Sequence, residues 1–177
     1  MNRILQIIKS FITSFRISLC NLLINMLPDD SISSQLRVFV AKILGLKCSH
    51  NIQLRRGIFY GNLKHITIGS HTIINREVFF DAYDQIKIGK NVGIAFRAVF
   101  ITSTHNTENW KDWSKSLIGA PITIEDSVWI GAGAMIGPGV TIGTGSIVAT
   151  GAVVMRSMPA HSMIVGNPAR VIKKLAE

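Results

Sequence analysis

A large apolar residue returns every sixth position over two long blocks of the chain, apart from a two-residue slip between Phe80 and Ile88 in the first block. The anchors are Ile68, Ile74, Phe80, Ile88, Ile94 and Phe100 in the first block, and Ile124, Ile130, Ile136, Ile142, Val148 and Val154 in the second. Most anchors are followed four positions later by a small or β-branched residue: Thr72, Val78, Val92, Ala98, Val128, Ala134, Val140, Ser146 and Ala152. A period of six fits neither an α-helix nor a series of hairpins. It predicts a parallel β-solenoid, in which each short strand gives one apolar side chain to the axis before the chain turns.

The expected organisation is therefore mainly β. At 177 residues the chain is long enough for one domain with a small appendage. We expect amphipathic helices over residues 1–48 and the solenoid over residues 49–177. The solenoid region is expected to include an extruded loop at 106–120 and a C-terminal segment at 160–177.

Composition points to a partner surface near the N-terminus. The hydrophobic content of 47% and the mean hydropathy of +0.34 are high for a soluble protein, so part of the surface is expected to meet a subunit or a membrane. Residues 1–64 carry nine basic and two acidic side chains, which is +7 of the net charge of +9. Such a local excess favours an anionic partner, such as a lipid surface or a polyanionic substrate. Nucleic acid is not expected, because the segment lacks interleaved aromatic residues and a recognised motif.

Residues 1–27 place apolar side chains at helical spacing, with cations on the other faces, and Pro28 ends the pattern. Lys9 and Arg16 interrupt what would otherwise be a transmembrane span of about 20 residues. Arg16 also divides the apolar stretch that a cleaved signal peptide would need. The two cysteines have no CxxC spacing, which favours a reducing compartment. We expect a cytoplasmic protein, and peripheral contact with the inner face of the membrane is one of two roles open for this segment.

A second helix is predicted to begin at a Ser33 or Ser34 cap and to end at Gly45. Two roles are open for the helix pair. The helices could cover the open end of the solenoid, because terminal coils need caps. They could also lie on an anionic membrane face as basic amphipathic helices. One helix pair could do both.

The six-residue rhythm stops at the segment ITSTHN and resumes at Pro121. The interruption, residues 106–120, is polar and includes Trp110 and Trp113. A solenoid does not need such a break, and long irregular loops in compact folds are usually functional. Two tryptophans within four residues favour an ordered loop that packs on something.

The C-terminal half resembles the hexapeptide-repeat acyltransferases. The resemblance rests on VWIGAGAMIGPGVTIGTGSIVATGAVVMRSMPAHSMIVGNPARVIKKL together with ITSTHN before the loop, and it covers Ile52 to Leu175. The galactoside/maltose acetyltransferase-like branch and the bacterial polysaccharide O-acetyltransferases are the most similar, and LPDDSISSQLRVFVAKILGLK resembles the lead-in helix of the latter. The resemblance implies a left-handed parallel β-helix, a homotrimer, and acyl-CoA bound between subunits. It implies transfer of an acetyl group from acetyl-CoA to a hydroxyl of a sugar, a polysaccharide or a lipid-linked glycan precursor, without a metal.

By the same resemblance, His105 matches the catalytic base that precedes the loop. A neutral imidazole suits this role, because the sugar hydroxyl must lose its proton as its oxygen attacks the thioester. The thiol that leaves is fairly acidic, so no dedicated strong acid is needed. Backbone N–H groups beside the loop would stabilise the oxyanion.

Four residues are candidates for the acceptor site. Asp81 is expected one coil away from His105, where it could bind acceptor hydroxyls, orient the histidine, or serve only as a polar turn residue. Asn75 and Glu77 fall where relatives place acceptor contacts. The galactoside branch carries Asn where this chain has Glu77, which argues against a simple galactoside acceptor. Trp110 is the candidate from the loop.

The resemblance implies a cofactor-binding set of Trp129, Ala132, Thr150, Ala152, Arg156, Arg170 and Lys173. The tryptophan would lie beside the pantetheine arm, and the small residues would leave room for that thin chain. The basic residues would contact the phosphates of CoA. The segment Gly166 to Pro168 is expected to turn the C-terminus back onto the coils.

Other functions remain open at this stage. The acceptor could be a small soluble molecule, such as an antibiotic, an amino acid or the amine of a nucleotide sugar. A β-helix zinc carbonic anhydrase would need three histidines, for which His65, His71 and His105 are available. A non-catalytic scaffold is a further reading. The basic apolar N-terminus favours a glycan acceptor at a membrane.

Overall fold

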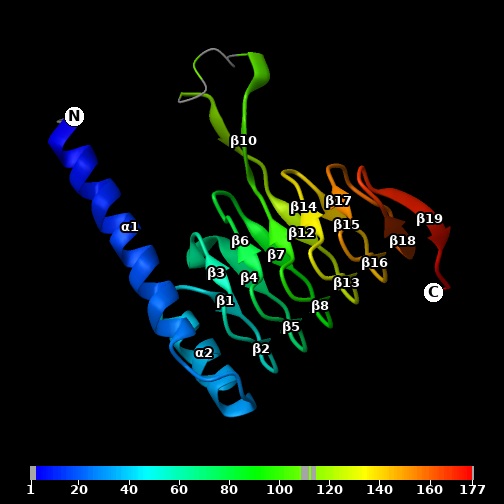
Figure 1. The fold of residues 1–177 in the computed structure, drawn as a ribbon, viewed down its shortest axis with the longest axis horizontal. Coiled ribbons are helices and arrows are strands. Elements are labelled where there is room, and N and C mark those ends of the chain that lie inside the picture. Colours follow the sequence, from blue (N-terminus) through cyan, green and yellow to red (C-terminus); the bar gives the residue numbers. More distant parts are fainter. Residues whose placement is uncertain (1–2, 109–111, 113–114, 177) are drawn as a thin grey trace.

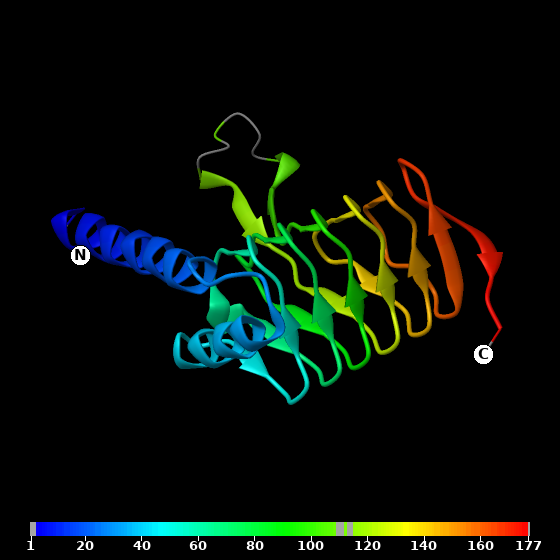
Figure 2. The ribbon, with the colours of Figure 1, turned by 60° about the horizontal axis from the view of Figure 1, so that its bottom comes forward.

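A computed structural model describes residues 3–108, 112 and 115–176. Two helices, α1 (Arg3–Asn25) and α2 (Ser31–Ile43), precede a parallel β-solenoid. Figure 1 shows the helices at one end of the solenoid and the C-terminus at the other. Figure 2 shows the coils stacked side by side, with a hairpin standing out from one edge. The predicted architecture is confirmed.

Three sheets form the faces of the solenoid. The first face contains β1 (Lys47–Cys48), β4 (Ile66–Ile68), β7 (Ile86–Ile88), β12 (Ile122–Ile124) and β15 (Thr141–Ile142). The second contains β2 (Gln53–Leu54), β5 (Ile73–Ile74), β8 (Gly93–Ile94), β13 (Trp129–Ile130), β16 (Ile147–Val148), β18 (Ser162–Val165) and β19 (Arg170–Lys174). The third contains β3 (Phe59–Tyr60), β6 (Phe79–Phe80), β9 (Val99–Phe100), β14 (Met135–Ile136) and β17 (Val153–Val154). A short 3-10 helix, Leu63–His65, lies between β3 and β4.

The six-residue anchors fill the axis of the solenoid. All twelve are at most 2% exposed, and the small residues four positions later are at most 1% exposed. Tyr60, Phe80 and Phe100 stack in successive coils, with ring centroids 6.0 and 5.0 Å apart. This column of apolar side chains supplies the main driving force for coil stacking.

The backbone turns at positions that repeat the same period. Left-handed φ values occur in the second block at Ser127, Gly133, Gly139, Gly145 and Gly151. Glycine adopts this conformation without the cost that a Cβ imposes, which is about 1–2 kcal/mol per residue. In the first block side-chain residues such as Glu77 and Arg97 occupy the equivalent corners, with φ near 59°.

The loop is an insertion that leaves the coil register intact. Ile68 pairs with Ile88, and Ile88 pairs with Ile124. The expected irregular loop contains structure of its own, because β10 (Ser103–His105) pairs antiparallel with β11 (Leu117–Gly119). The chain therefore leaves and re-enters the solenoid as a hairpin, so both ends of the insertion are fixed at one corner.

The start of α2 differs from the prediction. The cap is Asp30, whose carboxylate accepts hydrogen bonds from the N–H and the hydroxyl of Ser33, at 2.8 and 2.6 Å. Ser34 is instead turned inward and accepts from Leu54 N–H at 3.0 Å. Asp30 is favoured over the two serines as the cap because its negative charge interacts favourably with the positive N-terminal end of the helix dipole. At the other end Leu44 is the cap and Gly45 follows with φ 117°.

The helices lie over the first coil, as predicted by the alternative in which they cover the open end of the solenoid. Cys20 and Ile24 from α1, and Val38 and Ala41 from α2, join the apolar core. The C-terminal turn is also confirmed, because β19 returns antiparallel to β18. Among the described residues one helix, Ile4–Asn25, is long and apolar enough to cross a membrane by length and composition. The two cations that were expected to interrupt a span do not exclude it on that measure.

Candidate active site

His105 ends strand β10 and pairs with Leu117, at the end of the two-stranded ladder farther from the coils. Its side chain is exposed, and its Nδ1 lies 3.2 Å from the hydroxyl of Ser116, which is buried. Asn106 N–H donates to the Ser116 carbonyl at 2.8 Å and ties the two sides of the insertion together. The imidazole is thus held from one side by a rigid pair of strands and presented beyond the coils.

Asp81 lies at the hairpin corner, which we define as the corner that follows β3, β6, β9, β14 and β17. Its Oδ2 accepts hydrogen bonds from Ser103 N–H at 2.9 Å, Thr102 N–H at 3.2 Å and the Thr102 hydroxyl at 3.1 Å. The Thr102 hydroxyl in turn accepts from Asp84 N–H at 3.0 Å. Asp81 therefore fixes the segment that leads directly into His105.

A hollow of about 460 Å³ lies beside the same corner. Phe59 and Phe79 stack at its wall, with ring centroids 4.6 Å apart and planes 5° apart. Its lining residues are Ile17, Phe59, Gly61, Asn62, His65, Phe79, Asp81, Ala82 and Tyr83. Aromatic rings beside a few polar groups suit a ligand that has both apolar faces and hydroxyls.

Sequence reasoning missed the aromatic wall. A signal was available, because FY and FF place one aromatic residue directly before an inward one at positions 59–60 and 79–80. Successive side chains of a strand point to opposite faces, so Phe79 must point outward when Phe80 points inward. Phe59 and Phe79 are 39% and 38% exposed, whereas Tyr60 and Phe80 are buried.

The structure does not bring Asn75 and Glu77 to His105 within one chain. They lie between β5 and β6, at the corner between the second and third faces. Glu77 forms an exposed salt bridge with Arg97, at 2.7 Å from Nε to Oε2, and Asn75 accepts from the N–H of Arg76. Trp110 lies outside the described residues, as does Trp113.

Three of the expected cofactor residues gather at or near that same corner. Trp129 on β13 is 51% exposed and lies over Gly93, where an added Cβ would meet the ring at 2.4 Å. Ala132 and Thr150 flank the next turns, where Gly151 N–H donates to the Ala132 carbonyl at 2.9 Å. Ala152 is different: it is 1% exposed, so its methyl group packs in the core and cannot line the outer surface.

The expected phosphate contacts fall in two places. Arg156 follows β17 at the hairpin corner, and its side chain is exposed. Arg170 and Lys173 lie on the exposed strand β19, at the far end of the second face. Within one chain these cations therefore do not form a single cluster.

No group of three His, Cys, Asp or Glu side chains suited to a metal ion occurs in the described part of the chain. His65 lies near the hairpin corner, with Nδ1 3.0 Å from the Ala82 carbonyl. His71 lies at another corner, where it contacts Asn51 and the ring of His50. The three histidines considered for zinc are not brought together within one chain.

Residues 121–156 match the family model described as bacterial transferase hexapeptide (six repeats). A hexapeptide-repeat-containing acetyltransferase from Vibrio cholerae is 32% identical, with a TM-score of 0.78 and 93% of each chain covered. The chain belongs to the hexapeptide-repeat acetyltransferase family. The Vibrio protein has also been solved in complex with acetyl coenzyme A, and that structure covers 93% of this chain and 88% of the other, at 29% identity and a TM-score of 0.74.

The chain is also similar to three other proteins that are named as acetyltransferases. A maltose O-acetyltransferase from Clostridium difficile 630 is 28% identical, with a TM-score of 0.76, 94% of this chain and 89% of that chain covered. WcaF of Escherichia coli, named as a colanic acid biosynthesis acetyltransferase, is 27% identical over 80% of this chain and 76% of its own length. A Dictyostelium discoideum protein named as an acetyltransferase is 43% identical over 63% of this chain, and the match spans 58% of that relative's length.

Proposed function

We propose that this protein transfers the acetyl group of acetyl-CoA to a hydroxyl of a sugar within a polysaccharide or a lipid-linked glycan precursor. The observation that carries the proposal is His105, fixed by Ser116 at a hairpin beside the corner where Asp81 lines an aromatic-walled hollow. Family membership, the acetyl coenzyme A complex of the Vibrio relative and the sugar-related names of two others support it.

The chemistry follows from the orientation of the histidine. With Nδ1 facing Ser116, Nε2 is the nitrogen that takes the proton of the acceptor hydroxyl as the oxygen attacks the thioester carbonyl carbon. The tetrahedral intermediate collapses, the C–S bond breaks, and the imidazolium gives this proton to the departing thiolate, which leaves as free CoA thiol while the neutral histidine is restored. Backbone N–H groups near the hairpin corner would stabilise the oxyanion.

The cofactor site is proposed to lie between subunits of a homotrimer. The expected CoA contacts lie at separate places in one chain: Trp129 at the corner between the second and third faces, and Arg156 at the hairpin corner. Arg170 and Lys173 lie on β19. A cleft between neighbouring subunits would combine one corner from each and complete the site. Trp129 would flank the pantetheine arm, while Arg156, Arg170 and Lys173 would bind phosphate oxygens. A cytoplasmic location fits the use of acetyl-CoA.

The test is acceptor-dependent release of free thiol from acetyl-CoA, with sugars, amino sugars, nucleotide sugars and glycan fragments. His105→Ala is compared with His50→Ala, a control on an exposed histidine outside the hollow. Loss of a general base is expected to lower kcat by roughly 10²- to 10⁴-fold in the first variant and to leave the control unchanged. Activity that survives His105→Ala overturns the assignment. Cleavage of the product by mild base distinguishes an ester from an amide.

A further inference from the structure

Helix α1 docks on the solenoid through polar side chains. The carboxamide of Asn21 donates to the Tyr60 carbonyl at 2.9 Å and accepts from Tyr60 N–H at 2.8 Å. Asn25 makes the same kind of pair, donating to the Ile58 carbonyl and accepting from Gly57 N–H, both at 2.9 Å. These two amides satisfy the open edge of the first coil in place of a further strand.

The apolar side of the same helix faces away from the protein. Large apolar residues that are 42–71% exposed occur along the whole helix and just after it: Ile4, Leu5, Ile7, Ile8, Phe11, Ile12, Phe15, Leu19, Leu22, Leu23 and Met26. At the helical repeat they fall within an arc of roughly 160°. Cys20 and Ile24, which are buried, lie outside this arc. A surface helix of a soluble protein normally shows the reverse arrangement.

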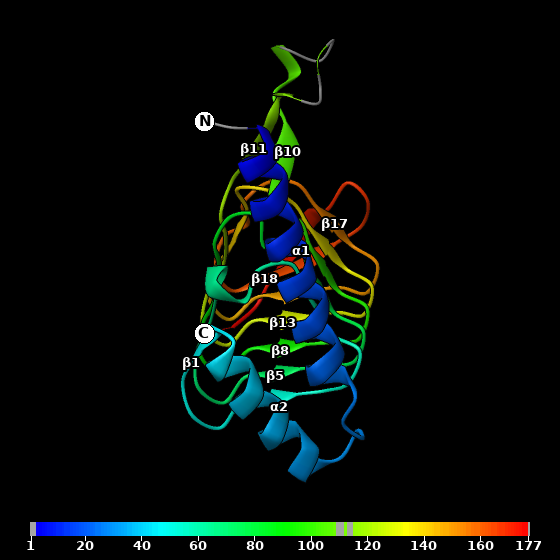
Figure 3. The ribbon, with the colours of Figure 1, turned by 90° about the vertical axis from the view of Figure 1, so that its left-hand side faces the viewer.

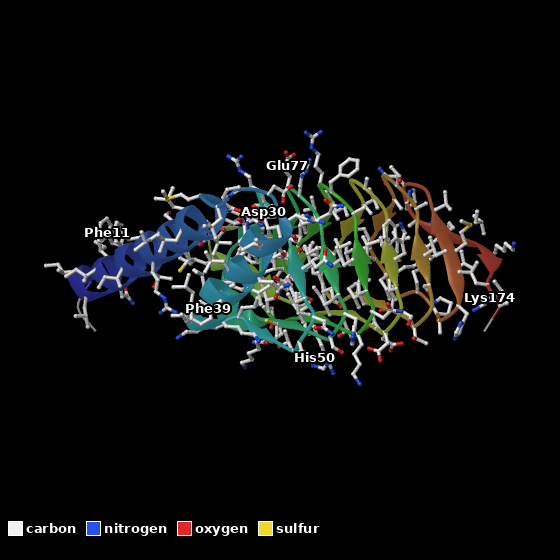
Figure 4. The ribbon with its side chains drawn as sticks, turned by 90° about the horizontal axis from the view of Figure 1, so that it is seen from below. Phe11, Asp30, Phe39, His50, Glu77 and Lys174 are labelled. Carbon is white, nitrogen blue, oxygen red and sulfur yellow. The ribbon has the colours of Figure 1, made fainter. Side chains whose placement is uncertain are left out.

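Helix α2 is inverted in the same way. It buries Ser33, Ser34, Arg37, Val38 and Ala41 against the first coil. It exposes Ile32, Leu36, Phe39 and Ile43, which are spaced as one helical face and are 45–83% exposed. Figure 3 looks onto the end of the solenoid, where both helices lie in front of the coils. Figure 4 labels Phe11 on α1 and Phe39 on α2, both at this end of the molecule.

The charges beside this apolar surface are positive. Residues 1–28 contain three basic and no acidic side chains. Asp29 and Asp30, which come next, are engaged by Arg76 and by the N-terminus of α2. A pocket of about 260 Å³ between α1 and the first coil is lined by Arg16 and Lys64, among residues of which none is acidic. In the part of the chain that the structure describes, neither cation forms a salt bridge.

We propose that the outward faces of α1 and α2 form a membrane-docking surface, which lies in the headgroup region of a bilayer rich in anionic phospholipid. An apolar arc flanked by cations is the chemistry that binds such an interface. Arg16 and Lys64 would hold a lipid phosphate, with the acyl chains beside Ile12 and Leu44 of the pocket. The helix lies on the bilayer rather than crossing it, because Asn21 and Asn25 fix the end of the Ile4–Asn25 stretch to the first coil, and Cys20 and Ile24 of the same stretch are buried in the core.

This inference does not rest on acetyl transfer, although it would bring the aromatic-walled hollow close to lipid-linked acceptors. Ile17, Gly61 and Asn62 line both that hollow and the pocket that contains Arg16. The two spaces therefore share a wall, and a headgroup at the cations would lie next to the proposed acceptor site.

The test is flotation of the full chain with vesicles of phosphatidylcholine alone or mixed with phosphatidylglycerol. We expect binding to the anionic vesicles that weakens in high salt. Phe11→Asp/Phe15→Asp and Phe39→Asp are each expected to weaken vesicle binding about tenfold or more. Each variant places negative charge on the apolar face that is proposed to enter the bilayer. Ile172→Asp is the matched control: Ile172 is 63% exposed on β19, far from the helices, and this variant should bind as the parent does. Arg16→Ala/Lys64→Ala should reduce the preference for anionic lipid.

Three results would overturn the proposal. The first is a folded parent protein, by circular dichroism, that binds neither vesicle. The second is a parent protein that binds no vesicles and forms an oligomer in light scattering, together with a Phe11→Asp/Phe15→Asp variant that does not form this oligomer. That result would assign the apolar face to contact with a second copy of the chain. The third is vesicle-bound protein that alkaline carbonate does not extract and that only detergent releases, which would show a spanning helix. Acetyl transfer to a soluble sugar should persist in Phe11→Asp/Phe15→Asp, so the two proposals fail separately.

Discussion

The Asp81 carboxylate accepts a hydrogen bond from the backbone N–H of Ser103 at 2.9 Å, across two neighbouring coils. Two residues after Ser103 the chain reaches His105. Because the same oxygen also accepts from both groups of Thr102, the start of the hairpin has little freedom to move. The contact favours a positioning role for Asp81, while its place in the hollow keeps an acceptor contact open.

Substitution of Asp81 separates these two roles. Asp81→Ala removes all three hydrogen bonds and is expected to lower kcat about tenfold, because a displaced base transfers the proton poorly. Asp81→Asn retains one acceptor oxygen and should recover most of the rate. Steady-state kinetics give kcat and the KM for the acceptor. A raised acceptor KM with an unchanged kcat would assign Asp81 to substrate binding instead.

Ser116 is the matching partner on the other strand of the hairpin. Ser116→Ala removes the oxygen that lies 3.2 Å from His105 Nδ1. We expect kcat to fall about tenfold with little change in the KM for acetyl-CoA, because the orientation of the base is lost and the cofactor contacts remain. Ser116→Thr keeps the hydroxyl and serves as the control. Equal losses in both variants would point to packing rather than orientation.

Arg37 supports the junction between the helices and the solenoid. It is fully buried, donates to the Leu54 carbonyl at 3.0 Å and the Leu27 carbonyl at 2.9 Å, and lies 3.9 Å from Asp29. Arg37→Ala would leave the buried Leu54 carbonyl and the part-buried Leu27 carbonyl without this donor, while Asp29 would keep Arg76. At about 1–3 kcal/mol for each acceptor left unsatisfied, the free energy of unfolding should fall by about 2–6 kcal/mol. Arg76→Ala removes the exposed partner of the same carboxylate and should cost no more than about 1 kcal/mol. Chemical denaturation measures both, and similar losses would contradict the argument.

Asp29 gives this junction a pH dependence. Burial alone would raise its pKa, but hydrogen bonds from Arg76 and from Arg56 N–H, with the charges of Arg76 and Arg55, leave the pKa lowered. A carboxyl whose pKa is lower in the folded state stabilises the fold above its unfolded value of about 3.9. That contribution is lost as the pH falls through the folded pKa. The difference in Tm between the parent and Asp29→Asn should therefore be constant near neutral pH and shrink below about pH 4. A difference that grows on acidification would reverse the sign.

The coil architecture could be predicted because the period of six determines which side chains are buried on the axis of the solenoid. Each anchor, such as Ile130, fills the axis, and the residue four positions later must be small enough to face the interior beside it. The same rule assigned Ala152 to the interior, and that conflicted with its expected place beside the cofactor. The repeat gives the direction of a side chain more reliably than a motif match gives its role.

The site could be predicted only in part. His105 stood out because the rhythm breaks beside it, but the hydrogen bond to Ser116 crosses an insertion whose pairing has no periodic signal. Asn75 and Glu77 share a coil with Asp81, yet the corner between β5 and β6 turns them to a different edge. The sequence left open whether the helices turn their apolar faces to the solenoid or outward, because helical spacing shows that an apolar face exists and not which way it points. The docking amides of Asn21 and Asn25 decide that direction.

Substitution of Gly93 tests the proposed cofactor surface and leaves the proposed catalytic base, His105, unchanged. The Trp129 ring lies against Gly93, and a Cβ there would come within 2.4 Å of the indole. Since φ at Gly93 is not in the left-handed region, Gly93→Ala acts through the ring rather than through backbone strain. The displaced indole should raise the KM for acetyl-CoA several-fold, by about 1 kcal/mol of lost contact, and leave kcat at saturating cofactor nearly unchanged. Trp129→Ala should give a larger effect of the same kind. A normal KM in both variants would remove Trp129 from the cofactor site and leave it as a packing residue of the second face.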